Sequence, residues 1–517
     1  MKKLLFAYVA IILSALSVYA QSIEINDVKK TKFSGVYPIL SGESGEVNGY
    51  FTYYMLEKGK KGMRTFQFAL MNNEMTELKK TDLELHKNSS INATVFNGKF
   101  LMISWDDFKN KKTVVKLIDT KGIVVKSKEF PFEKVRYAGT SVYPMKGGEG
   151  FYITRPEKRK KGILGYSIQK INNDLAVIWK QDVLPTRGSK SVKDLVNVED
   201  RLVVWEENSP KGNKKRPAIV CFEADKGAKV FEREGYDGVS TILNNQLRID
   251  KDNNIYAGGA YIDGDKYSSV NNDGIYLLKL DPNGKEILYT KVSNKEKIQQ
   301  ALKANSKGFA LGSKDKVFIE DLILVDDHII VVSEMFKKNM NMTPKPVQQT
   351  RDLITGKYVG WAEQNNDSKV TFEIKDFILF KFTQKGDLEE IKVIKKDKTN
   401  KITVWGSLTN LRGMDLAKLL AQRGWFDYGF TTLDQSGNSL MVCSNNATSK
   451  PDIAVYNVNE QYAKIKVNLK QQAKVDLEKA QVSYFKPIKN NKGKIAVAYY
   501  QKKLQKITVN LESIYEF

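Results

Sequence analysis

The chain has 517 residues and a formal net charge of +23, with 83 Lys and Arg against 60 Asp and Glu. Its length and its 41% of hydrophobic residues are enough for a sizeable core, and the positive excess favours anionic partners. Only two histidines and two cysteines are present, which excludes a histidine-rich metal centre, a cysteine-pair zinc motif and a disulfide-dense scaffold.

The N-terminal sequence MKKLLFAYVAIILSALSVYAQ has the pattern of a secretory signal peptide. Lys2 and Lys3 precede a mostly apolar run, and Val18 and Ala20 supply small residues ahead of a cleavage site. The run is shorter than the ~20 residues of a spanning helix. We therefore expect residues 1–20 to be removed and the mature chain to be exported to the periplasm, the outer-membrane surface or the extracellular space. The residue after the site is Gln21 rather than Cys, so no lipid anchor is expected there.

A unit of roughly fifty residues then repeats along the chain, which is the period of a β-propeller blade. Tight-turn pairs recur before short apolar strands, as in "KFLMISW" (99–105), "RLVVWEE" (201–207), "HIIVVSE" (328–334) and "KIAVAYY" (494–500). These runs are rich in β-branched and aromatic residues, as strands are. "DTKG" (119–122), "DPNG" (281–284) and "QKGD" (384–387) are hairpin turn signals.

The two ends of the chain indicate a closed ring. The last unit offers only three strands, whereas "SIEINDVKK" (22–30) is a spare strand ahead of the first full unit. An N-terminal strand that completes the last blade would remove the open sheet edges. We therefore predict an all-β fold, a single propeller domain over residues 21–517 with eight blades, or alternatively seven.

One unit carries a family resemblance. "IDKDNNIYAGG" (249–259) followed by "DGIYLLKLDPNGKEILYTK" (273–291) resembles the repeat of bacterial seven-bladed propeller proteins. The whole chain is similar in rhythm to exported propeller-like proteins of unknown function from Gram-negative bacteria. Neither resemblance implies a reaction, because a propeller fold alone implies none.

Insertions should mark one face of the ring. With the strands of a blade named A to D, the B–C loops and D–A crossovers share what we call the B–C face, and the A–B and C–D turns share the opposite turn face. Long insertions are expected near 293–315, 335–370 and 400–430. The first begins with a Ser293–Glu296 capping pair, and the last repeats Met414, Ala417 and Leu420 at helical spacing. All three insertions are predicted on the B–C face, which is often the binding side of a repeat fold.

The B–C hairpins also carry most of the recognisable charge. Basic tips recur in "EKGKKGMR" (57–64), "DDFKNKK" (106–112), "RPEKRKKG" (155–162) and "SPKGNKKR" (209–216). Tryptophans beside carboxylates near the ends of two B strands suit sugars, which stack on rings and bind charged groups. The alternative is that the tips are solvated and the tryptophans lie in the core. The candidate ligand-binding residues are Trp105, Asp106, Trp205, Glu206, Arg159, Lys160, Lys214, Lys215, Arg216, Trp361 and Trp425.

The sequence carries no recognised catalytic motif. No G-x-S-x-G elbow is present, "DKDNN" (250–254) reads as a β-turn rather than a calcium loop, and Cys221 and Cys443 are expected to be buried thiols. We expect no metal and no cofactor. The predicted function is a non-catalytic binding or scaffolding propeller whose partner is an acidic polysaccharide, lipopolysaccharide or another exported protein, and not nucleic acid. The alternative is a glycan-active hydrolase using carboxylates such as Asp106, Glu206, Glu207 and Glu334.

Overall fold

The fold is known from a computed structural model. It describes residues 22–28, 33–40, 46–58, 62–87, 89–131, 140–158, 164–198, 200–210, 216–265, 272–305, 312, 315–325, 328–341, 349–351, 358–361, 369–396, 399–404, 413–422, 425–433, 440–446, 452–457, 464–466, 482–491 and 493–513. The predicted signal peptide lies outside these residues. Within them, no helix is long and apolar enough to cross a membrane.

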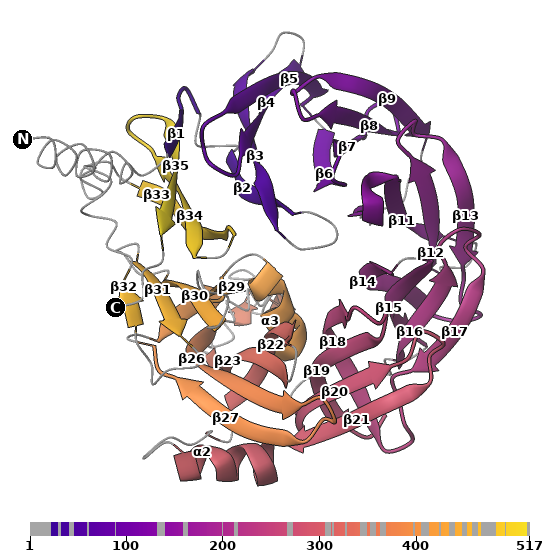
Figure 1. Ribbon diagram of the computed structural model, residues 1–517, viewed down its shortest axis with the longest axis vertical. Coiled ribbons are helices and arrows are strands. Elements are labelled where there is room, and N and C mark those ends of the chain that lie inside the picture. Colours follow the sequence, from indigo (N-terminus) through magenta and orange to yellow (C-terminus); the bar gives the residue numbers. More distant parts are fainter. Residues whose placement is uncertain are drawn as a thin grey trace, which may run out of the picture.

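The chain folds as a β-propeller, as the sequence predicts. Successive antiparallel groups of four strands follow one another around a ring in Figure 1, with the first strand of each group innermost. The inner strands of the blades are nearly continuous buried runs, as expected when both faces of a blade pack against neighbouring blades. Each core cluster accordingly draws on strands of adjacent blades.

We number the four-stranded groups as blades in chain order. Blade 1 contains β2 (Phe33–Leu40), β3 (Val47–Lys58), β4 (Met63–Asn72) and β5 (Leu78–His86). Blade 2 contains β6 (Ser89–Phe96), β7 (Phe100–Asp107), β8 (Lys112–Asp119) and β9 (Val124–Pro131). Blade 3 contains β10 (Ser141–Pro144), β11 (Gly150–Lys158), β12 (Leu164–Asn172) and β13 (Val177–Val183). Blade 4 contains β14 (Ser189–Val198), β15 (Arg201–Ser209), β16 (Arg216–Glu223) and β17 (Lys229–Glu234).

The second half continues the pattern. Blade 5 contains β18 (Ser240–Ile249), β19 (Ile255–Asp263), β20 (Gly274–Leu280) and β21 (Glu286–Ser293). Blade 6 contains β22 (Asp315–Leu324), β23 (His328–Asn341), β26 (Lys369–Thr383) and β27 (Leu388–Ile394). Blade 7 contains β29 (Tyr428–Leu433), β30 (Leu440–Asn446), β31 (Asp452–Asn457) and β32 (Lys464–Lys466). Blade 8 contains β33 (Val482–Lys489), β34 (Lys494–Gln501), β35 (Lys506–Ser513) and β1 (Ser22–Ile25).

Blade 8 closes the ring in the way that the sequence predicts. The N-terminal strand β1 pairs antiparallel with β35, in a register that sets Ser22 opposite Asn510 and Ile25 opposite Ile507. Ile23 and Ile25 are buried in a cluster shared by blades 8 and 1. The N-terminal strand therefore joins the two ends of the chain and covers the edge of β35 (Figure 1).

The C–D turns of blades 2, 4, 5 and 6 pack against the preceding blade. The first turn residue accepts backbone N–H bonds and the fourth has positive φ, as in Asp281 and Gly284 (φ 86°). Gly284 lies so close to β17 that a Cβ atom there would be 2.5 Å from Cγ of Phe231. On blade 2, the carbonyl of Gly122 likewise accepts a bond from the Thr81 hydroxyl of β5. The turn predictions at 119–122, 281–284 and 384–387 are confirmed.

Two of the predicted insertions form helices. The π-helix η5 (Asn294–Ile298) begins with the Ser293 cap and leads into α2 (Gln299–Asn305). Although this insertion leaves from the B–C face, Ile298 and Leu302 are buried against the outer strands of blades 5 and 6. It therefore fills a gap at the rim of the ring.

The other insertions build a small core on blade 6. Strands β23 and β26 continue beyond the blade, and β28 (Asn400–Val404) pairs with the extension of β26. Helix α3 (Gly413–Gln422) buries Met414, Ala417 and Leu420 against this extension, together with Phe426. A further hairpin, β24 (Gln349–Arg351) and β25 (Tyr358–Trp361), lies between β23 and β26 in the chain. The short 3-10 helix η3 (Lys146–Gly148) occupies the A–B turn of blade 3.

Candidate functional site

The B–C face is formed by the predicted hairpins and by the blade 6 insertion. The stretch 203–222 is a B–C hairpin, because β15 pairs with β16 along its length. Arg159, Lys160, Lys214 and Lys215 at the hairpin tips lie outside the described residues. Trp361 ends β25, and its side chain is not described.

The two tryptophans of the B strands lie in the interior. Trp105 packs in the cluster between blades 1 and 2, and Trp205 in the cluster between blades 4 and 5. They are 5% and 3% exposed. Each follows the inward alternation of its strand, so neither ring is presented to a glycan on the surface.

The carboxylates beside these tryptophans are also buried and have internal partners. Asp106 accepts a 2.7 Å hydrogen bond from the Thr113 hydroxyl. Glu206 accepts a 2.8 Å bond from the hydroxyl of Tyr166, and the ammonium of Lys190 lies 2.7 Å from its Oε1. Burial, together with the Glu206 charge, raises the pKa of the Tyr166 hydroxyl. Because buried charges need such partners, these groups fasten neighbouring strands to each other.

The most heavily charged buried cluster surrounds Glu334 on β23. Lys396 contacts Glu334 Oε1 and lies 2.9 Å from Asp427 Oδ2, and all three side chains are almost fully buried. The backbone N–H of Tyr428 donates to Glu334 Oε2 at 3.1 Å. Glu320, which sits at a β-bulge in β22, is hydrogen-bonded to Glu334.

The crowding of these buried charges changes the pKa values of two glutamates. Burial raises the pKa of Glu334 to about 7, although Lys396 opposes the shift. Burial and the neighbouring Glu334 charge raise the pKa of Glu320 well above its usual value. A glycosidase holds its two carboxyl groups about 5–10 Å apart to admit substrate or water. Glu320 and Glu334 touch each other instead, so the cluster joins blade 6 to the chain that follows α3.

Arg216 and Trp425 are the remaining described candidates. The guanidinium of Arg216 lies 3.3 Å from Asp265 and 4.1 Å from the ring centroid of Tyr236, so it joins blade 4 to blade 5. Trp425 follows α3 and is 38% exposed. Its neighbour Phe426 is buried with residues of α3 and β26, so this part of the chain anchors the insertion.

Two hairpin tips expose apolar side chains among lysines. On blade 2, Phe108 is 51% exposed, and Lys109 and Lys111 on either side of Asn110 are exposed as well. On blade 8, Leu504 is 59% exposed and directly follows two exposed lysines. Val239, in the crossover between blades 4 and 5, is also exposed on this face. The sequence shows the lysines, but it does not indicate that the apolar residues next to them are exposed.

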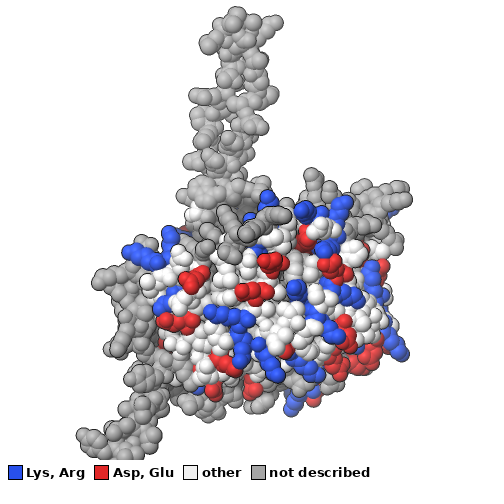
Figure 2. Space-filling model, turned by 90° about the horizontal axis from the view of Figure 1, so that it is seen from above, with Lys and Arg blue, Asp and Glu red and all other residues white. Residues whose placement is uncertain are grey.

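The rest of the described surface carries both signs of charge. Figure 2 shows Lys and Arg interspersed with Asp and Glu on the side of the ring that it presents. Basic and acidic side chains are nearly equal in number among the residues whose side chains are described. Most of the formal excess of +23 therefore belongs to the rest of the sequence, which includes the hairpin tips at 59–61, 159–163 and 211–215.

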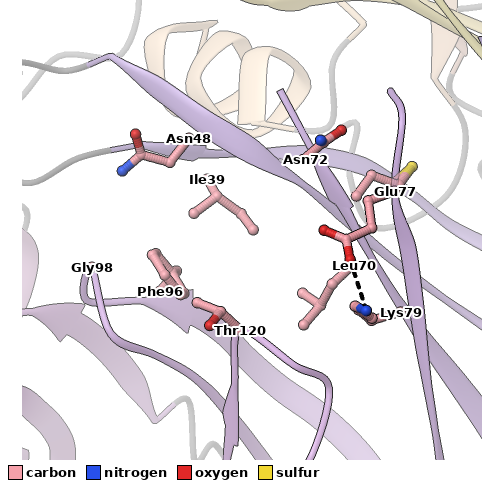
Figure 3. Close-up of a pocket in the computed structure, with 10 residues that line it drawn as sticks. Ile39, Asn48, Leu70, Asn72, Glu77, Lys79, Phe96, Gly98 and Thr120 are labelled. Atoms are coloured by element: carbon pink, nitrogen blue, oxygen red, sulfur yellow. Dashed lines mark ion pairs between the residues drawn. The ribbon is translucent and has the colours of Figure 1, made fainter. Parts of the chain in front are cut away.

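A pocket of about 340 Å³ lies on the opposite, turn face, between blades 1 and 2. Figure 3 shows Ile39 and Leu70 of blade 1 facing Phe96 and Thr120 of blade 2 across it. Asn48 and the ion pair between Glu77 and Lys79 add polar groups to the lining. Its volume is at the lower end of the range for small-molecule sites. Nothing in the sequence indicates this pocket, because its lining residues come from strand ends and turns of two different blades.

The expected thiols and turn are confirmed, and no metal cluster emerges. Cys221 and Cys443 are buried free thiols, and burial raises the pKa of Cys221 to about 12. Asp250 and Asn254 pair as a β-turn. In the described part of the chain, no group of three or more His, Cys, Asp or Glu is placed to hold a metal ion.

Comparisons with known proteins agree with this picture. A family model described as "Family of unknown function (DUF6770)" matches residues 1–515. No curated protein matches the sequence. Among solved structures, the chain is similar to the WD40 domain of SCAP from fission yeast, at 8% identity and a TM-score of 0.40, over 96% of this chain and 98% of that chain.

Two further structures are similar at the same level. Polysaccharide lyase Uly1 has 9% identity and a TM-score of 0.39, over 82% of this chain and 90% of that chain. The propeller domain of the Trilobed protease from Pyrococcus furiosus has 11% identity and a TM-score of 0.34, over 73% of this chain and 98% of that chain. These scores are too low to support any argument about function.

Proposed function

We propose a function from the surface of the protein itself, because the chain belongs to the DUF6770 family, whose function is unknown. The model of this family matches nearly the whole length of the chain. The protein is a non-catalytic binding propeller that acts outside the cytoplasm. Its B–C face binds acidic glycans, of the kind found in acidic polysaccharides and lipopolysaccharide. Export rests on the signal-peptide pattern of residues 1–20.

The observation that supports this proposal is the composition of the exposed hairpin tips. Lys109 and Lys111 flank the tip of blade 2, and the tip of blade 8 repeats the combination of two lysines with an exposed apolar residue. Lysines attract anionic groups over distances comparable with the Debye length, about 8–10 Å at physiological salt. An apolar side chain beside them adds contact with sugar or acyl carbon.

The hydrolase alternative has less support. Of the four carboxylates predicted for catalysis at the ends of B strands, Asp106, Glu206 and Glu334 are buried, each with an internal partner. Glu207 is half-buried, and its Oε1 lies 3.7 Å from the ammonium of Lys193. A catalytic acid or nucleophile has to reach the glycosidic bond. The three buried carboxylates could do so only if the blades separated.

The proposal is tested by glycan binding at low and high salt. We expect the mature protein to bind acidic polysaccharides and lipopolysaccharide, and to bind less as salt rises. Replacing either Lys109 or Lys111 by Ala should weaken binding several-fold. The matched control is Lys121→Ala, an exposed lysine of the same blade that lies at the other end of β8 on the turn face.

Each outcome has a distinct meaning. Equal losses for the tip and control variants would show that net charge, rather than this face, determines binding. Absence of binding to every acidic glycan would overturn the proposal. Release of shorter products from any bound glycan would instead favour the hydrolase.

A further inference from the structure

The second residue of the C–D turn joins neighbouring blades at two places in the ring. On blade 3 the turn begins at Asn172, so its second residue is Asn173. Asn173 Nδ2 donates a 2.8 Å hydrogen bond to the carbonyl of Gly148, in the A–B turn of the same blade. Its Oδ1 accepts a 2.9 Å bond from Asn97 Nδ2 of blade 2. One side-chain amide thereby links its own blade to the preceding one.

Gln384 makes the equivalent connection on blade 6. It follows Thr383, whose carbonyl accepts the turn bond from the backbone nitrogen of Gly386. Gln384 Nε2 donates a 3.0 Å bond to the carbonyl of Val325, which begins the A–B turn of blade 6. Its Oε1 accepts a 3.3 Å bond from the Tyr256 hydroxyl of blade 5. The same chemical group therefore has the same two roles at both junctions.

Blade 2 has a shorter side chain at this position, and the pocket between blades 1 and 2 opens there. Its C–D turn runs from Asp119 to Gly122, so the second residue is Thr120. Thr120 lines the pocket together with Gly98, from the A–B turn of blade 2, and Asn48 of blade 1 (Figure 3). Among the described residues, no hydrogen bond of the Thr120 or Asn48 side chain crosses this junction. A Cβ atom on Gly98 would have no neighbour within 4 Å, so the space beside the turn is open.

The walls of the pocket indicate what accompanies an amide here. Ile39 and Leu70 of blade 1 are 7% and 9% exposed, and they face Phe96 of blade 2 across the pocket (Figure 3). Beside the pocket, the Thr81 hydroxyl donates to the carbonyl of Gly122 and holds the two blades together. The walls are thus already in place, as in most small-molecule sites. A small acyl group suits such a space between two apolar surfaces.

The rim of the pocket is polar but carries no unmatched charge. Glu77 and Lys79 pair at 2.7 Å, with side chains 59% and 42% exposed. Because Lys79 already has a carboxylate partner, an anionic ligand would gain little from it. The hydroxyl groups of an uncharged sugar ring, by contrast, can bond to this pair and to the exposed Asn48.

We propose that this pocket binds an N-acetylated sugar, whose acetamido group takes the place that a side-chain amide holds at the other two junctions. The acetamido oxygen accepts from Asn48 of blade 1, and its N–H donates to a carbonyl of the A–B turn of blade 2 at Gly98. The methyl group lies between Leu70 and Phe96. The volume of about 340 Å³ suits a single sugar residue. The site is on the turn face and does not depend on the function proposed for the B–C face.

Isothermal titration calorimetry of the purified protein with three small probes tests the ligand class. We expect N-acetylglucosamine to bind, and glucose, which lacks the acetamido group, to bind at least about tenfold more weakly. Absence of N-acetylglucosamine binding, or equal binding of glucose, would overturn the proposal. Tighter binding of N-acetylalanine amide than of N-acetylglucosamine would indicate a peptide ligand and would overturn it as well.

Two substitutions test the location of the site. Thr120→Gln supplies the amide that blade 6 has at the equivalent position, so it should lower the affinity for N-acetylglucosamine at least about tenfold without lowering the midpoint of thermal unfolding. Asn48→Ala removes an exposed hydrogen-bond donor and should lower the affinity several-fold. The matched control is Lys121→Gln, the next residue of the same turn, which is exposed and does not line the pocket. Unchanged affinity in both Thr120→Gln and Asn48→Ala would refute the site.

This site and the proposed function can fail separately. N-acetylglucosamine is uncharged, so its binding should be the same at low and high salt and should be unchanged in Lys109→Ala. Conversely, Thr120→Gln should bind acidic polysaccharides as the unmodified protein does. Loss of N-acetylglucosamine binding in Lys109→Ala would place this ligand on the B–C face and would contradict the site between blades 1 and 2.

Discussion

The packing of C–D turns against the preceding blade predicts a specific loss of stability on Gly284→Ala. Gly284 has φ 86°, which an alanine adopts at a cost of about 1–2 kcal/mol. A Cβ atom would also lie 2.5 Å from Cγ of Phe231, and overpacking of this kind costs roughly 1–3 kcal/mol. We therefore expect the free energy of unfolding to fall by about 2–5 kcal/mol.

Gly264→Ala separates the two contributions. Gly264 has nearly the same backbone conformation, φ 84°, but a Cβ atom there would have no neighbour within 4 Å. Urea unfolding, followed by tryptophan fluorescence and by circular dichroism, should show a smaller loss for this variant, about 1–2 kcal/mol. If both variants lost the same stability, the contact between the turn and β17 would contribute nothing, and the view of the C–D turns as inter-blade contacts would be wrong.

Three more predictions concern buried groups. Lys396→Met should lower the free energy of unfolding by about 3–5 kcal/mol in thermal or urea unfolding, because Glu334 and Asp427 would lose their buried cation. Burial raises the Glu334 pKa from 4.5 to about 7, so the folded state holds this proton more tightly than the unfolded state. Stability from this group is complete below pH 4.5 and is lost as pH rises through 7, by at most about 3 kcal/mol, and urea titrations at pH 5 and 8 should show a smaller difference in Glu334→Gln. Cys221, with its pKa raised to about 12, should react with a thiol reagent only after denaturant is added, and rapid reaction in the native protein would contradict its burial.

The blade architecture is readable from the sequence because its signals are local. Turn chemistry such as "DPNG" fixes a hairpin within four residues, and the Ser293 cap places a helix start in the same way. The spare strand at 22–25 also follows from counting strands in the last unit. By contrast, the contact of Gly284 with Phe231 depends on how two blades pack, and the sequence around neither residue indicates it.

The candidate site likewise combines features that the sequence shows with features that only the folded ring reveals. The lysines of the hairpin tips can be found in the sequence, whereas the fate of Glu206 cannot. Tyr166, 40 residues away on blade 3, and Lys190 on β14 meet Glu206 only in the folded ring. Trp105 and Asp106 lie in a strand that the sequence predicts from its residue types. That strand is buried on both faces, so it presents no exposed side to a ligand. Sequence alternation therefore predicts strands here without telling which side chains a ligand can reach.

Ion pairs between neighbouring blades neutralise basic side chains along the ring. Arg233 of blade 4 pairs with Glu286 of blade 5 at 2.6 Å, and Arg248 of blade 5 pairs with Asp321 of blade 6 at 2.5 Å. Each such cation is matched by an acid on the next blade, so it contributes little to the long-range field. Among the described residues, no acid lies within ion-pair distance of Lys109 at the tip of blade 2. Substitution of Lys109 should therefore weaken glycan binding and change the free energy of unfolding by no more than about 0.5 kcal/mol, as is usual for surface positions. Arg233→Met should do the reverse: it should lower the stability of the ring and leave glycan binding by the folded protein unchanged.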